Sequence, residues 1–218
     1  MHLTVVGIAS DVDDLISGHS SLRRHLVAVQ IGPMGGEALT ELLMKCAASA
    51  RIEIDERARR LLVMSALGSP YHLRLFGFYS AITAMKQAKR TIDVQAAQEG
   101  LREAYREWGS VAQLAETMER IMRTAPENAQ GLLILAFIGA YVGRFDADKL
   151  LSGSMAMDNA RTLSISEANG VIAGALPLLS RIANSEVFMF TDTLMPQLMI
   201  IFERDKDIDL GFKDKNTA

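Results

Sequence analysis

Residues 5–43 read VVGIASDVDDLISGHSSLRRHLVAVQIGPMGGEALTELL, and the hydrophobic pattern changes twice within this stretch. Residues 3–9 and 26–31 are short apolar runs rich in β-branched side chains, which predicts two buried strands. The polar segment 12–25 between them is long enough for a helix. Two strands joined by a helix form a βαβ unit, which is the smallest piece of a parallel sheet. We therefore expect the chain to begin in the middle of a larger α/β domain.

From Gly35 onward the apolar residues recur with the period of amphipathic helices. Residues 187–190 form a short apolar run that predicts a strand, and 152–162 are rich in Ser, Gly and Asn, which predicts a loop. The helical pattern and the capping residues predict helices over 36–49, 55–67, 71–88, 91–108, 111–123, 129–142, 145–151, 166–182 and 193–204.

The charge of the chain is unevenly spread. Its 218 residues carry 23 basic and 26 acidic side chains, a net charge of −3. Residues 1–110 hold 13 of the basic and 12 of the acidic ones, whereas 111–218 hold 10 and 14. Phosphate backbones are bound by clustered Lys and Arg, so the second half is an unfavourable candidate for nucleic-acid binding.

The remaining composition limits the cell compartment and the kinds of site. Cys46 is the only cysteine, which excludes an internal disulfide and a cysteine-rich zinc site and favours the cytoplasm. The histidines lack the spacing of metal ligands, so no metal site is expected. The most apolar run, 131–142, is shorter than the roughly 20 residues that span a bilayer, so no membrane partner is expected.

The stretch quoted above resembles the second half of the AAA+ ATPase core, most closely its initiator-type and STAND-like branches. GIASD at 7–11 lies where the family has an apolar strand that ends in a small polar residue, which implies that Ser10 takes the nucleotide-facing sensor-1 position. Arg23 and Arg24 directly precede the next apolar run, where the family carries its arginine finger. The resemblance therefore implies a catalytic role for both arginines, stabilising γ-phosphate charge on a neighbouring subunit.

The resemblance continues to residue 108 through a helical lid. In the family, a Gly-x-x-Arg or Gly-x-Pro sequence opens the sensor-2 helix, and Gly68-Ser69-Pro70 has the second form. Tyr71 stands at the usual place of the arginine, and Arg74 lies one turn further along the same helix face. The resemblance implies that Pro70, Tyr71 and Arg74 face a bound nucleotide.

The resemblance also implies a domain organisation. Residues 1–33 correspond to a remnant of the ATPase core, 34–109 to the helical lid, and 110–218 to a winged-helix-like C-terminal domain. FMFTDTLMPQL at 188–198 is similar to the common ending of such domains: an aromatic strand, a polar cap and a helix. The expected fold class is mainly α, with a remnant βαβ unit, a lid bundle and a winged-helix-like module.

One family motif is missing from the sequence. No G-x-x-x-x-G-K-[ST] occurs, and no apolar strand ends in paired acids. Without these groups a chain lacks the phosphate cradle and the carboxylates that hold Mg²⁺. We expect the chain to be the C-terminal portion of a longer ATPase, with ATP and Mg²⁺ bound mainly by an N-terminal part, and to hydrolyse no ATP alone.

Each of these residues also has a plainer interpretation, and two other function classes stay open. Ser10 is equally suited to cap a helix, Arg23 and Arg24 to end one, and Arg74 to form a surface ion pair. The C-terminal half is alternatively a winged-helix DNA-binding regulator, whose reading helix 166–182 has Arg181 as its only cation. The chain is otherwise a helical adaptor, whose uncovered strands bind a protein partner or a second copy.

Overall fold

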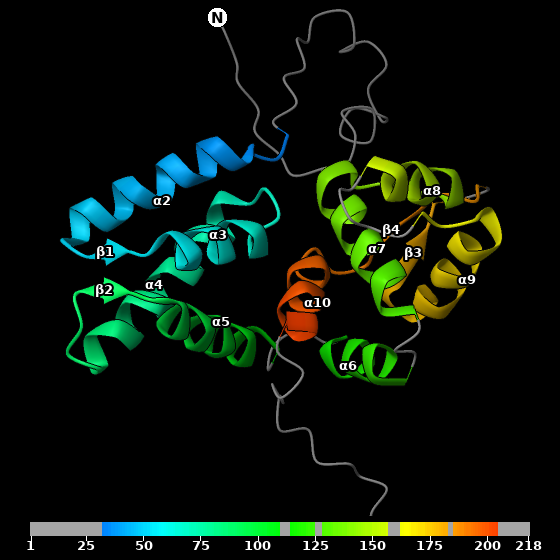
Figure 1. The fold of residues 1–218 in the computed structure, drawn as a ribbon. Coiled ribbons are helices and arrows are strands. Elements are labelled where there is room, and N and C mark those ends of the chain that lie inside the picture. The colour runs from blue at the N-terminus through cyan, green and yellow to red at the C-terminus, as the bar shows by residue number, and fades with distance from the viewer. Residues whose placement is uncertain (1–31, 110–113, 125–127, 157–161, 183–184, 205–218) are drawn as a thin grey trace, which may run out of the picture. The chain divides into compact units, whose positions relative to one another are not determined.

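The computed structural model describes residues 32–109, 114–124, 128–156, 162–182 and 185–204. The contacts of the chain divide it into two compact units, 1–32 and 33–218. The fold described below is that of the second unit (Figure 1). The βαβ unit expected in residues 1–33 lies outside the described residues, apart from its last two positions.

The first part of this unit consists of four helices and one pair of very short strands. The strands lie parallel, with Glu53 opposite Thr91 and Ile54 opposite Ile92. In chain order the elements are α2 (Gly36–Ala50), β1 (Glu53–Ile54), α3 (Glu56–Ser65), α4 (Pro70–Lys86), β2 (Thr91–Ile92) and α5 (Val94–Gly109). The predicted helices are confirmed here, except that 91–108 begins with a strand.

The connection from α2 to β1 and the connection from α4 to β2 have the same backbone conformation. Arg51 and Ala88 both take a left-handed backbone conformation, with φ of 54° and 56°. The amide of Ile52 then donates to the carbonyl of Ala47, and Lys89 donates in the same way to Ala84, which ends each helix with a Schellman-type turn. An isoleucine and an aspartate follow in both cases, and that aspartate precedes the next helix.

Helices α4 and α5 pack closely because Gly100, on the face of α5 that meets α4, has no side chain. A Cβ atom at Gly100 would lie 2.5 Å from the backbone nitrogen of Ser80 and 2.6 Å from its Cα atom. Ser80 is itself fully buried, and its hydroxyl donates to the carbonyl of Phe76. Around this contact lies a core of fully buried large side chains: Leu39, Leu62, Leu73, Phe76 and Tyr105.

The second part combines further helices with a hairpin. Strands β3 and β4 pair antiparallel, with Leu179 opposite Phe190, and Phe145 forms an isolated bridge with Phe188. In chain order the elements are α6 (Ala115–Thr124), α7 (Ala129–Val142), α8 (Ala147–Ala156), α9 (Ile165–Ala175), a 3-10 turn η3 (Leu176–Leu178), β3 (Leu179–Arg181), β4 (Phe188–Phe190) and α10 (Met195–Arg204).

Two boundaries in this part differ from the predictions. The predicted helix 166–182 ends at Ala175, because Pro177 has no amide hydrogen to continue it and the chain passes through η3 into β3. Helix α8 runs to Ala156, into the predicted loop 152–162. The start of α9 follows a capping box in which Ser164 and Glu167 bond reciprocally. The prediction of a mainly α fold is confirmed.

Helix α10 joins the two parts. It packs on α6 and α7 and also contacts α3 and α5. The ring of Phe202 stacks on Tyr105 with centroids 6.3 Å apart, and the Arg123 guanidinium lies 4.9 Å above the Phe202 ring. The Tyr105 hydroxyl donates to Glu119 at 2.8 Å. These contacts make residues from α5, α6 and α10 one buried cluster.

Candidate functional site

The turn that opens α4 has the most constrained backbone among the predicted site residues. Gly68 has a φ of +79°, which favours glycine, and its carbonyl accepts the Met34 amide at 2.8 Å. A Cβ atom at Gly68 would lie 2.5 Å from Pro33 Cβ and 3.1 Å from the ring of Tyr141. The start of α4 therefore lies against residues 33–34, where the chain enters this unit, and against α7.

Residues Ser69 and Pro70 begin α4 as the sequence predicts. The Ser69 hydroxyl accepts the His72 amide at 3.3 Å, and Pro70 occupies the first turn, where its missing amide hydrogen costs nothing. The Ser69 amide donates to the Ala66 carbonyl, so the Tyr71 amide is the one N–H of this first turn without a partner among the described residues. Together with the positive dipole end of the helix, this single amide favours an anion over a cation here.

Tyr71 lies on the surface of this turn. Its side chain is 63% exposed, and one face of its ring stacks on Trp108 of α5 at 6.1 Å, with an angle of 12° between the planes. The stacking fixes the ring, and the rest of the side chain stays open to solvent. Tyr71 is thus a pre-positioned aromatic group next to the anion-suited end of α4.

His72 lies behind Tyr71 and is the least expected polar group of the site. It is 8% exposed and lies edge-on to Trp108 at 4.7 Å and near Phe76. Neither ring nitrogen has a hydrogen-bond partner among the described residues. Burial without a partner disfavours the charged form and lowers the pKa of His72 to about 4. The imidazole is therefore neutral at physiological pH.

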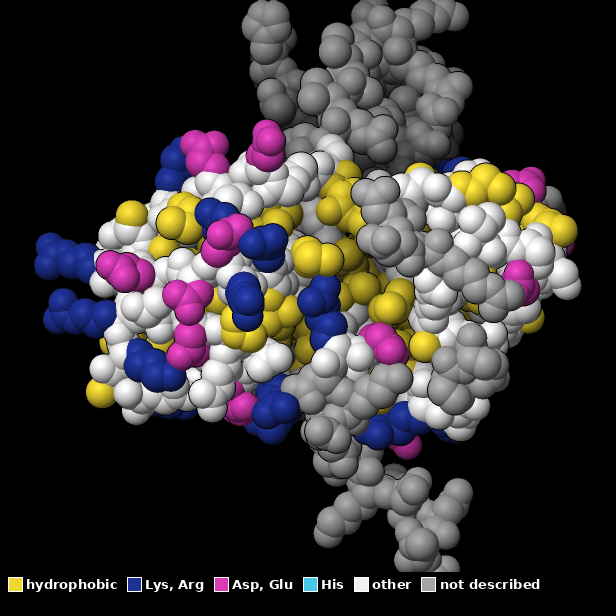
Figure 2. Space-filling view, viewed as in Figure 1, with side chains coloured by type: hydrophobic (Ala, Val, Ile, Leu, Met, Phe, Trp, Pro, Cys, Tyr) yellow, Lys and Arg dark blue, Asp and Glu magenta, His cyan; other side chains and the backbone are white. Residues whose placement is uncertain are grey.

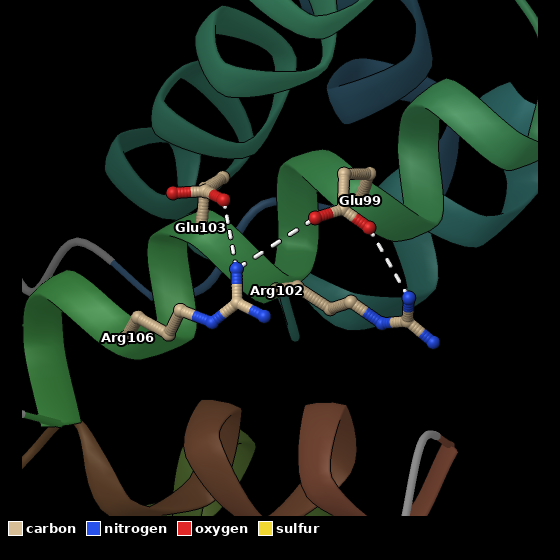
Figure 3. A network of polar contacts seen from close by, with 4 residues as sticks. All are labelled: Glu99, Arg102, Glu103 and Arg106. Carbon is tan, nitrogen blue, oxygen red and sulfur yellow. Dashed lines mark hydrogen bonds and ion pairs between the residues drawn. The ribbon is translucent and has the colours of Figure 1, made fainter. Parts of the chain in front are cut away.

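Arg74 lies one turn further and differs from most cations of this part. Its side chain is exposed and makes no hydrogen bond or ion pair with another described residue. By contrast, the cations of α5 are held by carboxylates of their own helix, as Figure 3 shows: Arg102 bonds Glu99 at 3.1 Å and Arg106 bonds Glu103 at 2.8 Å. An unpaired guanidinium is available to bind an external anion.

A pocket of about 240 Å³ opens between α2 and α4 beside the paired strands. Its walls are apolar, with Leu42 and Cys46 from α2, Phe78 from α4, and Ile54 from β1. Among the described residues, Arg74 is the only charged side chain that lines it. The pocket thus combines an apolar floor with one cation that has no partner among the described residues.

The other predicted site residues lie outside the described part of the chain. These are Ser10, Arg23 and Arg24, so their positions relative to Tyr71 and Arg74 are not described. Within the described ranges, no group of three His, Cys, Asp or Glu side chains is arranged to hold a metal ion. No helix among them has both the length and the apolar character to cross a bilayer.

The sequence reasoning missed His72 and Trp108 as members of this site. The available signal was the spacing of His72 and Phe76, which places both on one face of a helix. The spacing alone was not enough, because the site also needs Trp108 of α5 to pack against that face of α4. No local sequence pattern predicts which residues of α4 and α5 come into contact.

Charge in the second part differs from that around α4. Over the face shown in Figure 2, Lys and Arg side chains gather over α2–α5, whereas few lie over α7–α9. Helix α9 contains no Lys or Arg at all. Arg181, expected on the reading helix, instead belongs to β3 and pairs with Glu186.

Comparisons of the chain with models of known protein families, with curated protein sequences and with solved structures found no match.

Proposed function

We propose that this chain supplies the helical lid and a winged-helix-like C-terminal module of an AAA+/STAND-type ATPase, contributing nucleotide sensing and partner coupling. The observation that carries the proposal is the position of the Gly68–Pro70 turn. It lies beside residues 33–34, where the chain arrives from the segment that resembles the ATPase core. This position supports the proposal, because in such an ATPase the start of the sensor-2 helix faces the nucleotide held by the core.

The side chains at this turn fit a nucleotide. The Tyr71 amide at the start of α4 and the Arg74 guanidinium suit phosphate oxygens, and the stacked ring of Tyr71 suits a flat base or ribose. In this proposal Ser10 completes the nucleotide-facing set, and Arg23 and Arg24 stabilise charge on a neighbouring subunit's phosphate. In the proposal, Mg²⁺ and the phosphate cradle belong to an N-terminal part of the kind that the family carries.

Coupling to the C-terminal module has a direct route in the packing. Tyr141 at the end of α7 contacts the Gly68 turn, and Phe202 of α10 stacks on Tyr105 of α5. A shift of the lid on nucleotide binding moves packed side chains in both places, because close-packed interfaces do not deform continuously. The module then presents this shift to a partner.

The order of elements supports the winged-helix-like assignment. Three helices, α7, α8 and α9, precede the β3–β4 hairpin, and Phe145 between α7 and α8 bridges to Phe188 of β4. A winged helix has three helices followed by a β-hairpin, and a short extended segment after its first helix pairs with that hairpin. We expect this module to bind protein, because α9 carries Glu167 and no cation.

A winged-helix DNA-binding regulator remains the second candidate, favoured by this same order of elements. A mobility assay at low salt with a random duplex distinguishes the two. Salt-dependent binding in the micromolar range would support the regulator, since non-specific binding comes from phosphate contacts. The absence of a shift up to that concentration would support protein coupling.

The test of the ATPase proposal compares variants of the full product of the gene. Arg74→Ala and Arg23→Ala/Arg24→Ala are each expected to lower kcat for ATP by at least about tenfold, because each removes charge stabilisation at the phosphates. Arg57→Ala is the matched control, since Arg57 is exposed on α3 and likewise has no ion-pair partner among the described residues. Unchanged turnover in both test variants would remove the assigned roles.

A further inference from the structure

The pocket between α2 and α4 is bordered by apolar surface that nothing in the described residues covers. Phe78 on its wall is 57% exposed, and Met85, two turns along α4, is 69% exposed. Large apolar side chains that gather beside an apolar pocket mark a place where another apolar group binds. The pocket volume of about 240 Å³ suits one or two side chains.

The chemistry of the occupant follows from the lining. Its floor excludes a polar chain, because buried polar groups would find no partner there. Its cation, Arg74, has no partner among the described residues. An acidic group beside the bound apolar side chain would therefore form an ion pair with Arg74. The pocket therefore selects a segment in which apolar and acidic residues stand close together.

The end of this chain has that composition. Residues 205–218 read DKDIDLGFKDKNTA, in which Ile208, Leu210 and Phe212 are the large apolar residues. They alternate with Asp207 and Asp209, so an extended backbone directs the apolar side chains to one side and keeps the acids at its outer edge.

The starting point of this segment lies within reach of the pocket. The Arg204 guanidinium at the end of α10 is 3.9 Å from the Met64 sulfur near the end of α3. Ile54, on the pocket wall, lies two residues before α3, and ten residues of helix rise about 15 Å, to which the lengths of the Arg204 and Met64 side chains are added. Eight extended residues, 205–212, span about 26 Å. The length of the segment is thus comparable with its distance from the pocket.

We propose that residues 205–212 fold back onto the lid, with Leu210 and Phe212 in the pocket and an aspartate beside Arg74. This docking concerns the chain by itself and does not rest on the ATPase assignment. Where both hold, the segment and a nucleotide compete for Arg74, so the docked segment withholds it from the nucleotide.

The test uses Cys46, which lines the pocket and is the only cysteine of the chain. Its alkylation by iodoacetamide, a small uncharged reagent, is followed by mass spectrometry in the full chain. Leu210→Ser/Phe212→Ser is expected to speed the reaction at least about fivefold, since a segment that occupies the pocket four-fifths of the time slows it by that factor. Lys213→Ser/Lys215→Ser, in the same segment, is expected to leave the rate unchanged.

A charge exchange tests the contact with Arg74 separately. Arg74→Glu is expected to speed the alkylation of Cys46, and adding Asp207→Lys/Asp209→Lys to it is expected to slow the reaction again. Circular dichroism verifies that each variant keeps its helix content. A rate in Leu210→Ser/Phe212→Ser equal to that of the unaltered chain would overturn the proposal. Protection that grows with protein concentration would also overturn it, because a second copy would then be the occupant.

Discussion

His72 illustrates how a single side chain is set by its neighbours. Its ring lies between Trp108 and Phe76, and its two nitrogens lack partners among the described residues. The carbon atoms of the ring are well packed there, but the polar atoms gain nothing from burial. The site therefore accommodates a flat aromatic ring but disfavours the charged, doubly protonated imidazole. This is why the pKa of His72 falls to about 4.

This pKa predicts a pH dependence of stability. Below about pH 6.5 the unfolded chain binds a proton at His72, whereas the folded chain does so only near pH 4. The free energy of unfolding should therefore fall by about 3 kcal/mol from this residue as the pH drops from 7 to 4. We expect His72→Phe to lose that part of the dependence and to be no less stable at pH 7. Urea titrations at both pH values measure it, with His19→Phe as control.

A fall in stability that is the same in His72→Phe and in the unaltered chain would contradict the assignment. Carboxylates with lowered pKa, such as Asp93 bonded to Lys89 and to the Ala96 amide, titrate in both chains and cancel in the comparison.

At the scale of elements, helices were predictable because their signals are local. The apolar run 129–142 became α7 without change, and α9 begins at Ile165, one residue before the predicted start, after an N-cap at Ser164. The strands β1 and β2 were not predictable from such signals, because two residues have no measurable period. The repeated Ile-Asp at Ile54 and Ile92, each after a helix and before another, was the one available hint.

The candidate site was predictable only where a turn motif decided it. Gly68 and Pro70 mark the start of α4 in the sequence, and this places Tyr71 and Arg74 on one face. The stacking of Trp108 on Tyr71 and the apolar pocket under Arg74 depend on how α2, α4 and α5 pack. Packing between helices depends on side chains far apart in the sequence, so local pattern does not determine it.

The closeness of α4 and α5 makes a testable element-scale prediction. Gly100→Ala introduces a methyl group against the Ser80 backbone and should lower the free energy of unfolding by about 2–4 kcal/mol. Gly170→Ala is the matched control, because Gly170 lies exposed in α9 with no atom within 4 Å of its added Cβ. We expect this control to be neutral or to stabilise by up to about 1 kcal/mol. Denaturant titrations in which both substitutions have equal effects would refute this view of the helix contact.

At the scale of the molecule, residues 33–218 form one compact unit, which contains both the predicted lid and the predicted C-terminal domain. The cluster of Tyr105, Glu119 and Phe202 explains this, because it buries side chains from α5, α6 and α10 together, with the exposed Arg123 over the Phe202 ring. The proposed modules meet near residue 110, and side chains from both sides of that position pack together.

This packing predicts cooperative unfolding. Phe202→Ala should lower the unfolding free energy by about 3–5 kcal/mol and should shift the transition seen by Trp108, which lies one turn from Tyr105 at the C-terminal end of α5. Trp108 is the only tryptophan, so the fluorescence comes from the lid. Circular dichroism follows all helices, and the two transitions should coincide. A lid transition unaffected by Phe202→Ala, while the helix signal shifts, would show two independent parts.

The most direct test of the ATPase account is steady-state turnover of ATP by two purified proteins, measured side by side with Mg²⁺ present. One is the 218-residue chain, and the other, called the full product, is the longer protein with an N-terminal phosphate-binding part that this account expects the gene to encode. The account predicts no phosphate release above background for the chain of 218 residues and measurable release for the full product. Turnover by the 218-residue chain, or none by the full product, would contradict it.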